Sequence, residues 1–317
     1  MTKNTISAIV PVYNEGENLM ELYDRLKTTL KSISEKHQII FVNDGSKDDS
    51  LIKILSIAEE DSKVFYLNLS RNFGHQIAVS AGLEYCDAEC TVIIDADLQD
   101  PPELIEQLYK KHKEGYDVVY AKRKKREGES FLKKLTAKFY YRLLKRWVSF
   151  DIPLDAGDFR LISRKVVGAI NKMPEQNKFL RAQIAWLGFK QTHVLFDRET
   201  RKHGKSGYSY GKMLRLAFDG ITGFSDKPLL FVSRLGFLIS IFSFLLIIYA
   251  VFSHYILKVT ITGWTSLLIS TAFIGGIQLL SIGVIGEYIS RINSNVKGRP
   301  LYILDSTNIP SEEDKKA

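Results

Sequence analysis

Three short polar segments follow apolar runs in the first third of the chain, and they are rich in carboxylate and amide side chains. They are Pro11–Glu15 (PVYNE), Asn43–Ser46 (NDGS) and Asp95–Asp100 (DADLQD). In the third segment, Asp95 and Asp97 could both reach one divalent ion if the loop between them turns, and Gln99 could add a carbonyl oxygen. Such oxygen ligands suit Mg²⁺ or Mn²⁺, which keep coordination positions for substrate phosphates. The sequence therefore predicts a metal site in this segment.

Apolar β-type runs and helical patterns alternate over the first 125 residues and would position these segments. The expected strands are Ile6–Val12, Gln38–Asn43, Val64–Leu69, Thr91–Asp95 and Asp117–Ala121, and the expected helices are Glu17–Ile33, Asp48–Glu60, His75–Tyr85 and Pro102–Lys113. Such alternation predicts an α/β fold with a mostly parallel sheet and helices on both faces. Ligands of these sheets bind at the carboxyl ends of the strands, so the polar segments should meet at one edge.

Two long uncharged runs in the last third of the chain predict a membrane anchor. Leu235–Leu257 and Val259–Gly286 contain no Asp, Glu, Lys or Arg, and each exceeds the roughly 20 apolar residues that a spanning helix needs. We expect transmembrane helices at about 232–255 and 265–288, forming a hairpin within residues 228–290. The alternative is a pair of buried helices in a soluble core.

The distribution of charge around this hairpin predicts its orientation. Basic residues flank it on both sides, whereas Lys258 is the only fixed charge in its connecting loop. By the positive-inside rule, the domain at residues 1–227 and the tail at residues 291–317 face the cytoplasm. The tail from Ser306 is polar, and we expect it to be frayed.

Two further segments have the pattern of helices that lie in the membrane interface. Lys133–Ser149 has six Lys or Arg residues, no acid and an apolar residue every fourth position, and Tyr210–Phe224 leads into the first apolar run. We expect interfacial helices at about 133–149 and 210–226, with a surface helix packed on its own domain as the alternative for the first. The net charge of +8 also suits nucleic acid. However, the basic residues gather near the apolar runs, so we expect no nucleic-acid partner.

Five motifs together resemble family 2 glycosyltransferases, in particular the bactoprenol glucosyltransferase branch, which is close to dolichyl-phosphate mannose synthases. They are PVYNE, NDGS, SRNFGH (Ser70–His75), DADLQDPPE (Asp95–Glu103) and DAGDFRL (Asp155–Leu161), and GEYISRI (Gly286–Ile292) and KGRPLY (Lys297–Tyr302) extend the match over nearly the whole chain. The resemblance implies a GT-A-type fold. The Q-x-x-R-W motif of processive synthases is missing because Leu143 occupies the glutamine position, which favours transfer of one sugar per turnover.

The resemblance also implies roles for the residues of these motifs. The expected donor-binding residues are Pro11, Tyr13, Glu15, Asp44, Arg71, His75, Asp95 and Ala96, with the first four on the uridine and ribose. Asp95, Asp97 and Gln99 would hold Mg²⁺ or Mn²⁺ on the donor diphosphate. Asn43 stands where many relatives have Asp, which leaves Asp44 as the only acid of its motif.

The expected catalytic residues are Asp97, Asp158 and Arg123, and the role of Asp158 keeps an alternative. Asp158 would contact the sugar hydroxyls or assist attack, or it would have a structural role and pair with Arg160. His75 would bond the donor or cap its own helix. For the acceptor, we expect Arg123, Arg201, Lys205 and Ser206 to cradle a lipid phosphate, whereas the basic residues after Arg123 form a solvated loop near anionic headgroups.

These observations together predict inverting transfer of one sugar from a UDP-sugar to polyprenyl (undecaprenyl) phosphate at the inner membrane, for modification of a cell-envelope glycan. The resemblance implies glucose as the sugar, with UDP-N-acetylglucosamine and UDP-galactose as alternative donors. A non-catalytic membrane scaffold or lipid-carrier subunit is the alternative from another class. Relatives suggest a homotetramer, and small residues such as Gly275, Gly276, Gly283 and Gly286 are consistent with contact between spanning helices.

Overall fold

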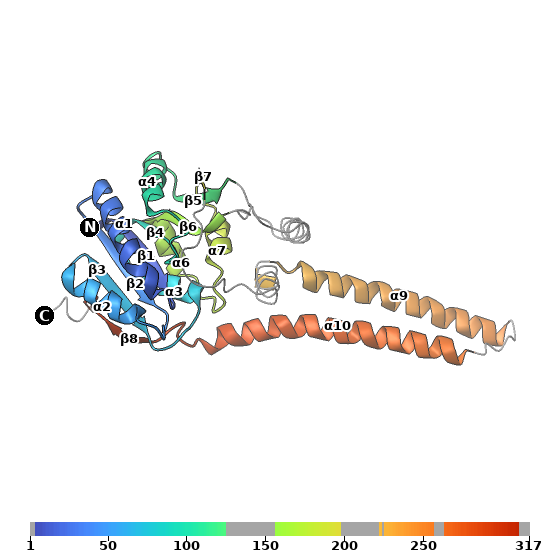
Figure 1. Cartoon of the computed structure of the whole chain (residues 1–317). Helices are drawn as coiled ribbons and strands as arrows, with labels where there is room; N and C mark the ends of the chain where they lie inside the picture. The colour runs from blue at the N-terminus through green and yellow to red at the C-terminus, as the bar shows by residue number, and fades with distance from the viewer. Residues whose placement is uncertain (1–3, 125–155, 198–221, 224, 257–262, 311–317) are drawn as a thin grey trace.

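The computed structural model describes residues 4–124, 156–197, 222–223, 225–256 and 263–310 (Figure 1). Within these residues an eight-stranded sheet has the order β7-β5-β6-β4-β1-β2-β3-β8. The expected interfacial helix at 133–149 lies outside the described residues, and so does most of the one expected at 210–226. The expected α/β class with a mostly parallel sheet is confirmed, because only β6 and β8 run against the other strands.

The centre of the sheet is a set of four parallel strands that the sequence patterns predict, although the fourth begins three residues earlier and ends two residues earlier than the expected Thr91–Asp95. They are β1 (Asn4–Val12), β2 (His37–Asn43), β3 (Val64–Leu69) and β4 (Ala88–Ile93). Their nearly continuous apolar runs are buried on both faces, as expected for parallel strands covered by helices. The helices α1 (Gly16–Ile33), α2 (Ser50–Glu60) and α4 (Ile105–Lys113) pack on one face, whereas α3 (His75–Glu84), α6 (Arg164–Asn171) and α7 (Leu180–Trp186) pack on the other. A 3₁₀ turn at Pro102–Leu104 precedes α4.

Three strands complete the sheet beyond β4. They are β5 (Val118–Arg123), β6 (Ala156–Ser163) and β7 (Gln191–Phe196). β6 pairs antiparallel with both β4 and β5, so the DAGDFRL segment, which was not among the expected strands, is a strand that separates two others. Its Phe159 and Leu161 fill one core and its Ile162 the other, and this burial on both faces explains the insertion.

The C-terminal segment is also part of the sheet. β8 (Leu304–Thr307) pairs antiparallel with β3, and Asn308 accepts a hydrogen bond from the backbone N–H of Tyr66 at 2.8 Å. The expectation of a frayed tail from Ser306 is therefore wrong for residues 306–309. Without β8, β3 would be an edge strand with unpaired backbone groups, and the C-terminal segment satisfies these groups.

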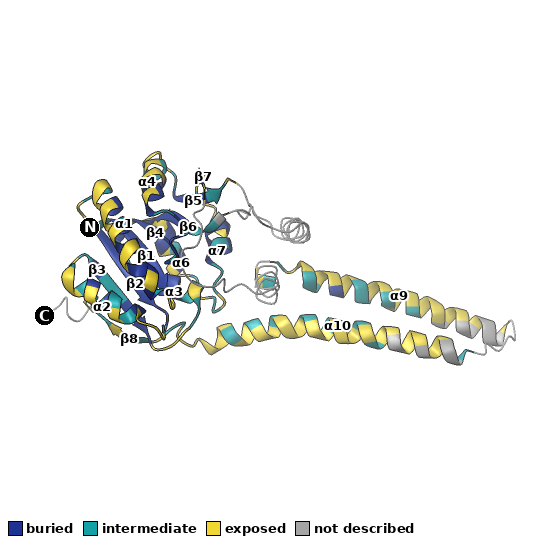
Figure 2. Ribbon diagram, viewed as in Figure 1, coloured by how far each residue is buried: buried dark blue, intermediate teal, exposed yellow. Residues whose placement is uncertain are grey.

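Two long helices, α9 (Lys227–Tyr255) and α10 (Trp264–Lys297), extend side by side away from the domain (Figure 1). Both are long and apolar enough to cross a membrane, and at most 6% of either apolar stretch is buried. In Figure 2 the described residues of α10 are mostly exposed, and those of α9 are mostly a mixture of exposed and intermediate. A soluble protein would bury such faces, so the alternative of two core helices is wrong. Because β8 follows α10 and lies in the sheet, the second helix returns to the side of the domain.

Candidate active site

The loops after β1 and β2 are joined by hydrogen bonds at the carboxyl edge of the sheet. The backbone N–H of Asn14 donates to Ser46 Oγ at 3.0 Å, and the N–H of Lys47 donates to Asn14 Oδ1 at 2.7 Å. Asn14 has a φ of 55°, a left-handed conformation that Asn tolerates better than most residues. The two polar segments predicted to converge therefore contact each other directly.

Asp44 joins the loop after β2 to the loop after β3. Its Oδ1 accepts the N–H of Phe73 at 2.7 Å, and its Oδ2 accepts the N–H of Gly74 at 3.0 Å. Burial raises the pKa of Asp44, and these two N–H groups oppose the rise. Gly45 has a φ of 65°, and a Cβ there would lie 2.5 Å from the backbone carbon of Arg71. Asp44 thus holds the loops after β2 and β3 together, and its contact with a ribose stays a prediction.

The other expected donor residues occupy the same edge of the sheet. Tyr13 is 44% exposed, so its ring is accessible to a ligand, whereas Ala96 is buried. Glu15 accepts a hydrogen bond from Asn18 at 2.6 Å. The Arg71 guanidinium lies 4.1 Å from the centre of the Phe73 ring. Pro11 is within β1 and pairs with Val42 of β2.

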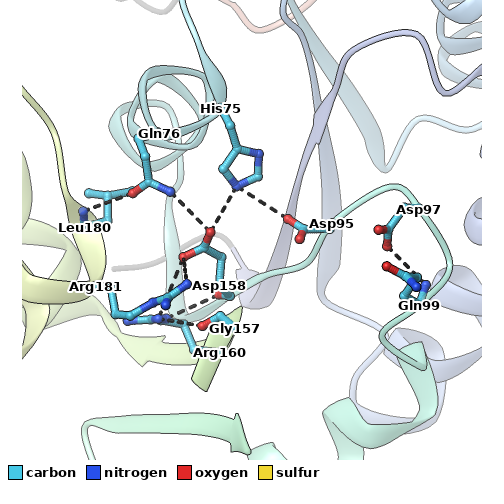
Figure 3. A network of polar contacts seen from close by, with 10 residues as sticks. All are labelled: His75, Gln76, Asp95, Asp97, Gln99, Gly157, Asp158, Arg160, Leu180 and Arg181. Atoms are coloured by element: carbon cyan, nitrogen blue, oxygen red, sulfur yellow. Dashed lines mark hydrogen bonds and ion pairs between the residues drawn. The ribbon is translucent and has the colours of Figure 1, made fainter. Parts of the chain in front are cut away.

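Asp158, at the start of β6, is the centre of a polar network (Figure 3). Its Oδ2 lies 3.4 Å from His75 Nε2 and accepts a hydrogen bond from Gln76 Nε2 at 3.3 Å. Its Oδ1 lies 3.3 Å from an Arg181 nitrogen and 3.9 Å from an Arg160 nitrogen. One carboxylate therefore ties together α3, β6 and α7, so the expected pairing of Asp158 with Arg160 is part of a larger cluster.

Charges in this cluster set its protonation states. Burial alone would raise the pKa of Asp158, but Arg181, His75 and Arg160 outweigh it and hold that pKa well below its usual range. Burial alone would lower the pKa of His75, but Asp95 and Asp158 raise it to about 9. Burial lowers the pKa of Arg160 to about 10. At neutral pH, three cations therefore face two carboxylates.

The DADLQ loop after β4 carries the predicted metal ligands. Asp95 Oδ1 lies 3.4 Å from His75 Nε2, and Asp97, which is 9% exposed, accepts the backbone N–H of Gln99 at 3.1 Å. Figure 3 shows Asp95 turned toward His75 and Asp97 further along the same loop. No group of three or more His, Cys, Asp or Glu side chains suited to a metal occurs among the described residues. Two carboxylates match Mg²⁺ or Mn²⁺ bound largely through substrate phosphates, so these residues fit an ion that arrives with a diphosphate.

Arg123, the last residue of β5, lies next to this cluster. A Cβ on Gly157 would be 3.8 Å from one of its guanidinium nitrogens, and Gly157 directly precedes Asp158. The structure thus brings Arg123 to the same edge as the acidic loops. The other expected acceptor residues, Arg201, Lys205 and Ser206, lie outside the described residues.

Sequence reasoning missed Gln76 and Arg181. Gln76 donates to Asp158 and accepts the backbone N–H of Leu180 at 3.0 Å, so it also positions the first turn of α7. Arg181 is the one charged residue in the apolar stretch Leu180–Trp186. A lone cation on a buried helix face requires a partner, and that signal could have drawn attention to it.

Comparison with known proteins gives consistent matches. A sequence model described as Glycosyl transferase family 2 matches residues 7–170. The chain is 48% identical to the uncharacterized glycosyltransferase YkcC of Bacillus subtilis, over 95% of this chain and 93% of that protein. It is 44% identical to the uncharacterized glycosyltransferase sll0501 of Synechocystis sp., over 94% of each. It is 38% identical to the SfII prophage-derived bactoprenol glucosyl transferase of Shigella flexneri, over 96% of this chain and 98% of that protein.

Proposed function

The chain belongs to glycosyl transferase family 2, and we propose that it transfers one glucose from UDP-glucose to the phosphate of a polyprenyl lipid with inversion at the anomeric carbon. Relatives at 38% identity, from Shigella flexneri and Shigella phages, are named bactoprenol glucosyl transferases. These names support both the sugar and the lipid acceptor. Transfer from UDP-N-acetylglucosamine or UDP-galactose is the alternative within the same chemistry.

The arrangement of three cationic side chains around Asp158 is the observation that carries the choice of acceptor. Arg181, His75 and Arg160 surround this carboxylate and keep it from holding a proton. A sugar hydroxyl needs a base to take its proton as it attacks. A lipid phosphate needs none, because its second pKa is about 6 and it is already mostly anionic. The cluster therefore suits an anionic acceptor, with Asp158 orienting the sugar.

In the proposed step, an oxygen of the lipid phosphate forms a bond to the anomeric carbon while the bond from that carbon to the UDP oxygen breaks. The electron pair leaves on UDP, and backside attack converts an α-linked donor into a β-linked product. A divalent ion held by Asp95, Asp97 and Gln99 would stabilise the charge gained by the diphosphate. Arg123, with Arg201, Lys205 and Ser206, would offset the repulsion between the two anions.

We place this reaction at the cytoplasmic face of the inner membrane. The two exposed apolar helices α9 and α10 support a membrane anchor, and β8 keeps the C-terminal segment on the same side as the catalytic domain. Basic flanks support a cytoplasmic orientation. A homotetramer built through the spanning helices is part of the same proposal.

The test is transfer of labelled glucose from UDP-glucose to undecaprenyl phosphate by the purified chain in detergent with Mg²⁺ or Mn²⁺. Mass analysis of the glycolipid after a screen of UDP-sugars identifies the sugar. We expect Asp97→Asn to lower transfer at least about 100-fold, since it removes a charge that stabilises the transition state, while expression and membrane insertion stay unchanged. Full activity in that variant would reject the metal site, and no transfer from any donor would favour the non-catalytic scaffold.

A further inference from the structure

The segment after α10 is attached to the donor side of the sheet as well as to its edge. We call residues 298–310 the C-terminal strap. Its Ile303 carbonyl accepts the backbone N–H of Ser70 at 3.0 Å, and Ser70 begins the loop whose N–H groups bond Asp44. The strap also contacts Asn68, the last polar side chain before that loop. The chain that leaves the second long helix therefore touches the base of a donor loop.

A line of side-chain hydrogen bonds continues from the strap into the sheet. Asn68 Nδ2 donates to Asp305 Oδ2 at 2.9 Å and approaches Ser306 Oγ at 3.3 Å. Asn43 Nδ2 donates to Asn68 Oδ1 at 2.8 Å, and Asn43 Oδ1 accepts the backbone N–H of Ser46 at 3.3 Å. Asn43 and Asn68 are 2% and 7% exposed. We call this line the amide relay.

The groups at the two ends of the relay allow only one direction of hydrogen bonding. The Asp305 carboxylate can only accept, and the Ser46 N–H can only donate. Each amide between them must therefore turn its NH₂ toward Asp305 and its oxygen toward Ser46. An amide turned the other way would face a like group in a buried position, which is costly.

We propose that Asp305 and Asn68 are positioning residues for the donor nucleotide, because they fix the Asn43 amide that holds the Ser46 end of the NDGS loop. Ser46 in turn bonds Asn14 in the first polar loop, and Asp44, beside Asn43, holds the third. The C-terminal strap, which directly follows the second long helix, thus orders the nucleotide site. This inference rests on the proposed function only in naming the ligand as a uridine nucleotide.

Reversing the relay tests the proposal. Asn43→Asp places an acceptor-only group against the Asn68 oxygen. Position 43 lies on the Oδ1 side of the Asn68 amide and Asp305 on its Nδ2 side, so Asn68 can turn its NH₂ group toward only one of the two carboxylates. We expect UDP affinity, measured by calorimetry with Mn²⁺ on the full chain in detergent, to fall about fivefold or more. Hydrogen exchange across residues 70–75 should become faster, because the amides bonded to Asp44 lose their fixed support. The double variant Asn43→Asp/Asp305→Asn can donate from position 305 and accept at position 43, and both readouts should return to within about twofold of the unaltered chain.

Matched variants separate the relay from simple loosening of the strap. Thr307→Val removes a strap bond to the Tyr66 carbonyl at 2.7 Å without touching the relay, and it should leave UDP affinity unchanged. Asp305→Ala changes an exposed side chain at the end of the relay, so it can replace Asn43→Asp in the test if that variant does not fold. It should make hydrogen exchange across residues 70–75 faster. The proposal is overturned if the double variant stays as weak as Asn43→Asp, or if Thr307→Val has the same effect. A chain that binds no UDP overturns the proposed function, while the exchange measurements still decide the relay.

Discussion

Two arginine–aspartate pairs with the same separation test how burial sets the value of an ion pair in this protein. The pair of Arg181 and Asp158 and the pair of Arg164 and Asp87 are both 3.3 Å apart. The first pair has side chains 24% and 15% exposed, whereas the second has 59% and 47% exposed. Replacing each arginine by methionine keeps much of its apolar length and removes its charge, so the two variants form a matched comparison.

The expected magnitudes follow from solvation. Removing one partner of a buried pair costs about 3–5 kcal/mol, because a carboxylate stays buried without its counter-charge. Asp158 keeps His75 and Arg160 as cations and the pair is partly exposed, so we expect about 2 kcal/mol for Arg181→Met. Exposed pairs contribute about 0–1 kcal/mol, which is the expectation for Arg164→Met. For a domain of this size, Tm should fall by about 4–8 °C for Arg181→Met and by at most about 4 °C for Arg164→Met.

The assay is thermal unfolding of the full chain in detergent, followed by intrinsic fluorescence. Arg181→Met should also lower kcat, because Asp158 loses the cation that orients it, whereas Arg164→Met should retain full transfer. Equal shifts in Tm for the two variants would refute the reasoning, since burial would then make no difference at equal distance.

Two further perturbations test the acceptor site and the pH dependence of stability. Arg123→Ala should raise the KM for undecaprenyl phosphate about tenfold or more, as expected for loss of a charge-assisted contact, and leave UDP affinity nearly unchanged; equal losses would assign Arg123 to the donor. Burial lowers the pKa of His37, whose Nδ1 lies 2.7 Å from the Ser34 carbonyl. The unfolded chain therefore binds a proton first, so stability should fall as pH drops below about 6.5. His37→Gln should show a smaller loss of Tm between pH 7.5 and 5.5, and an unchanged loss would contradict this assignment.

Local pattern was sufficient for the elements whose signal is contained in one stretch of chain. The four parallel strands, the helices between them and the two long apolar helices were all predicted, because hydrophobic periodicity and uncharged length are properties of neighbouring residues. The polar segments after β1, β2 and β4 were also placed correctly at one edge, since parallel strands bring their carboxyl ends together. The family resemblance was confirmed by the matches over nearly the full chain.

Tertiary structure decided the features that depend on pairing between distant segments. β6 is inserted between β4 and β5, and β8 reaches β3 from more than 230 residues away; such pairings are set by burial and by open sheet edges, which no local pattern records. Asp158 was read as a sugar contact or a partner of Arg160, yet its surroundings include Gln76 and Arg181 from two separate helices.

The sequence by itself determined which groups are available: carboxylates at the strand ends, arginines at the end of β5 and in the DAGDFRL motif, and two long apolar helices. Only the fold decided which charges meet. The pKa values of Asp158 and His75 depend on distances of 3–4 Å between residues that lie far apart in the chain, and such distances exist only once the sheet and its helices have packed.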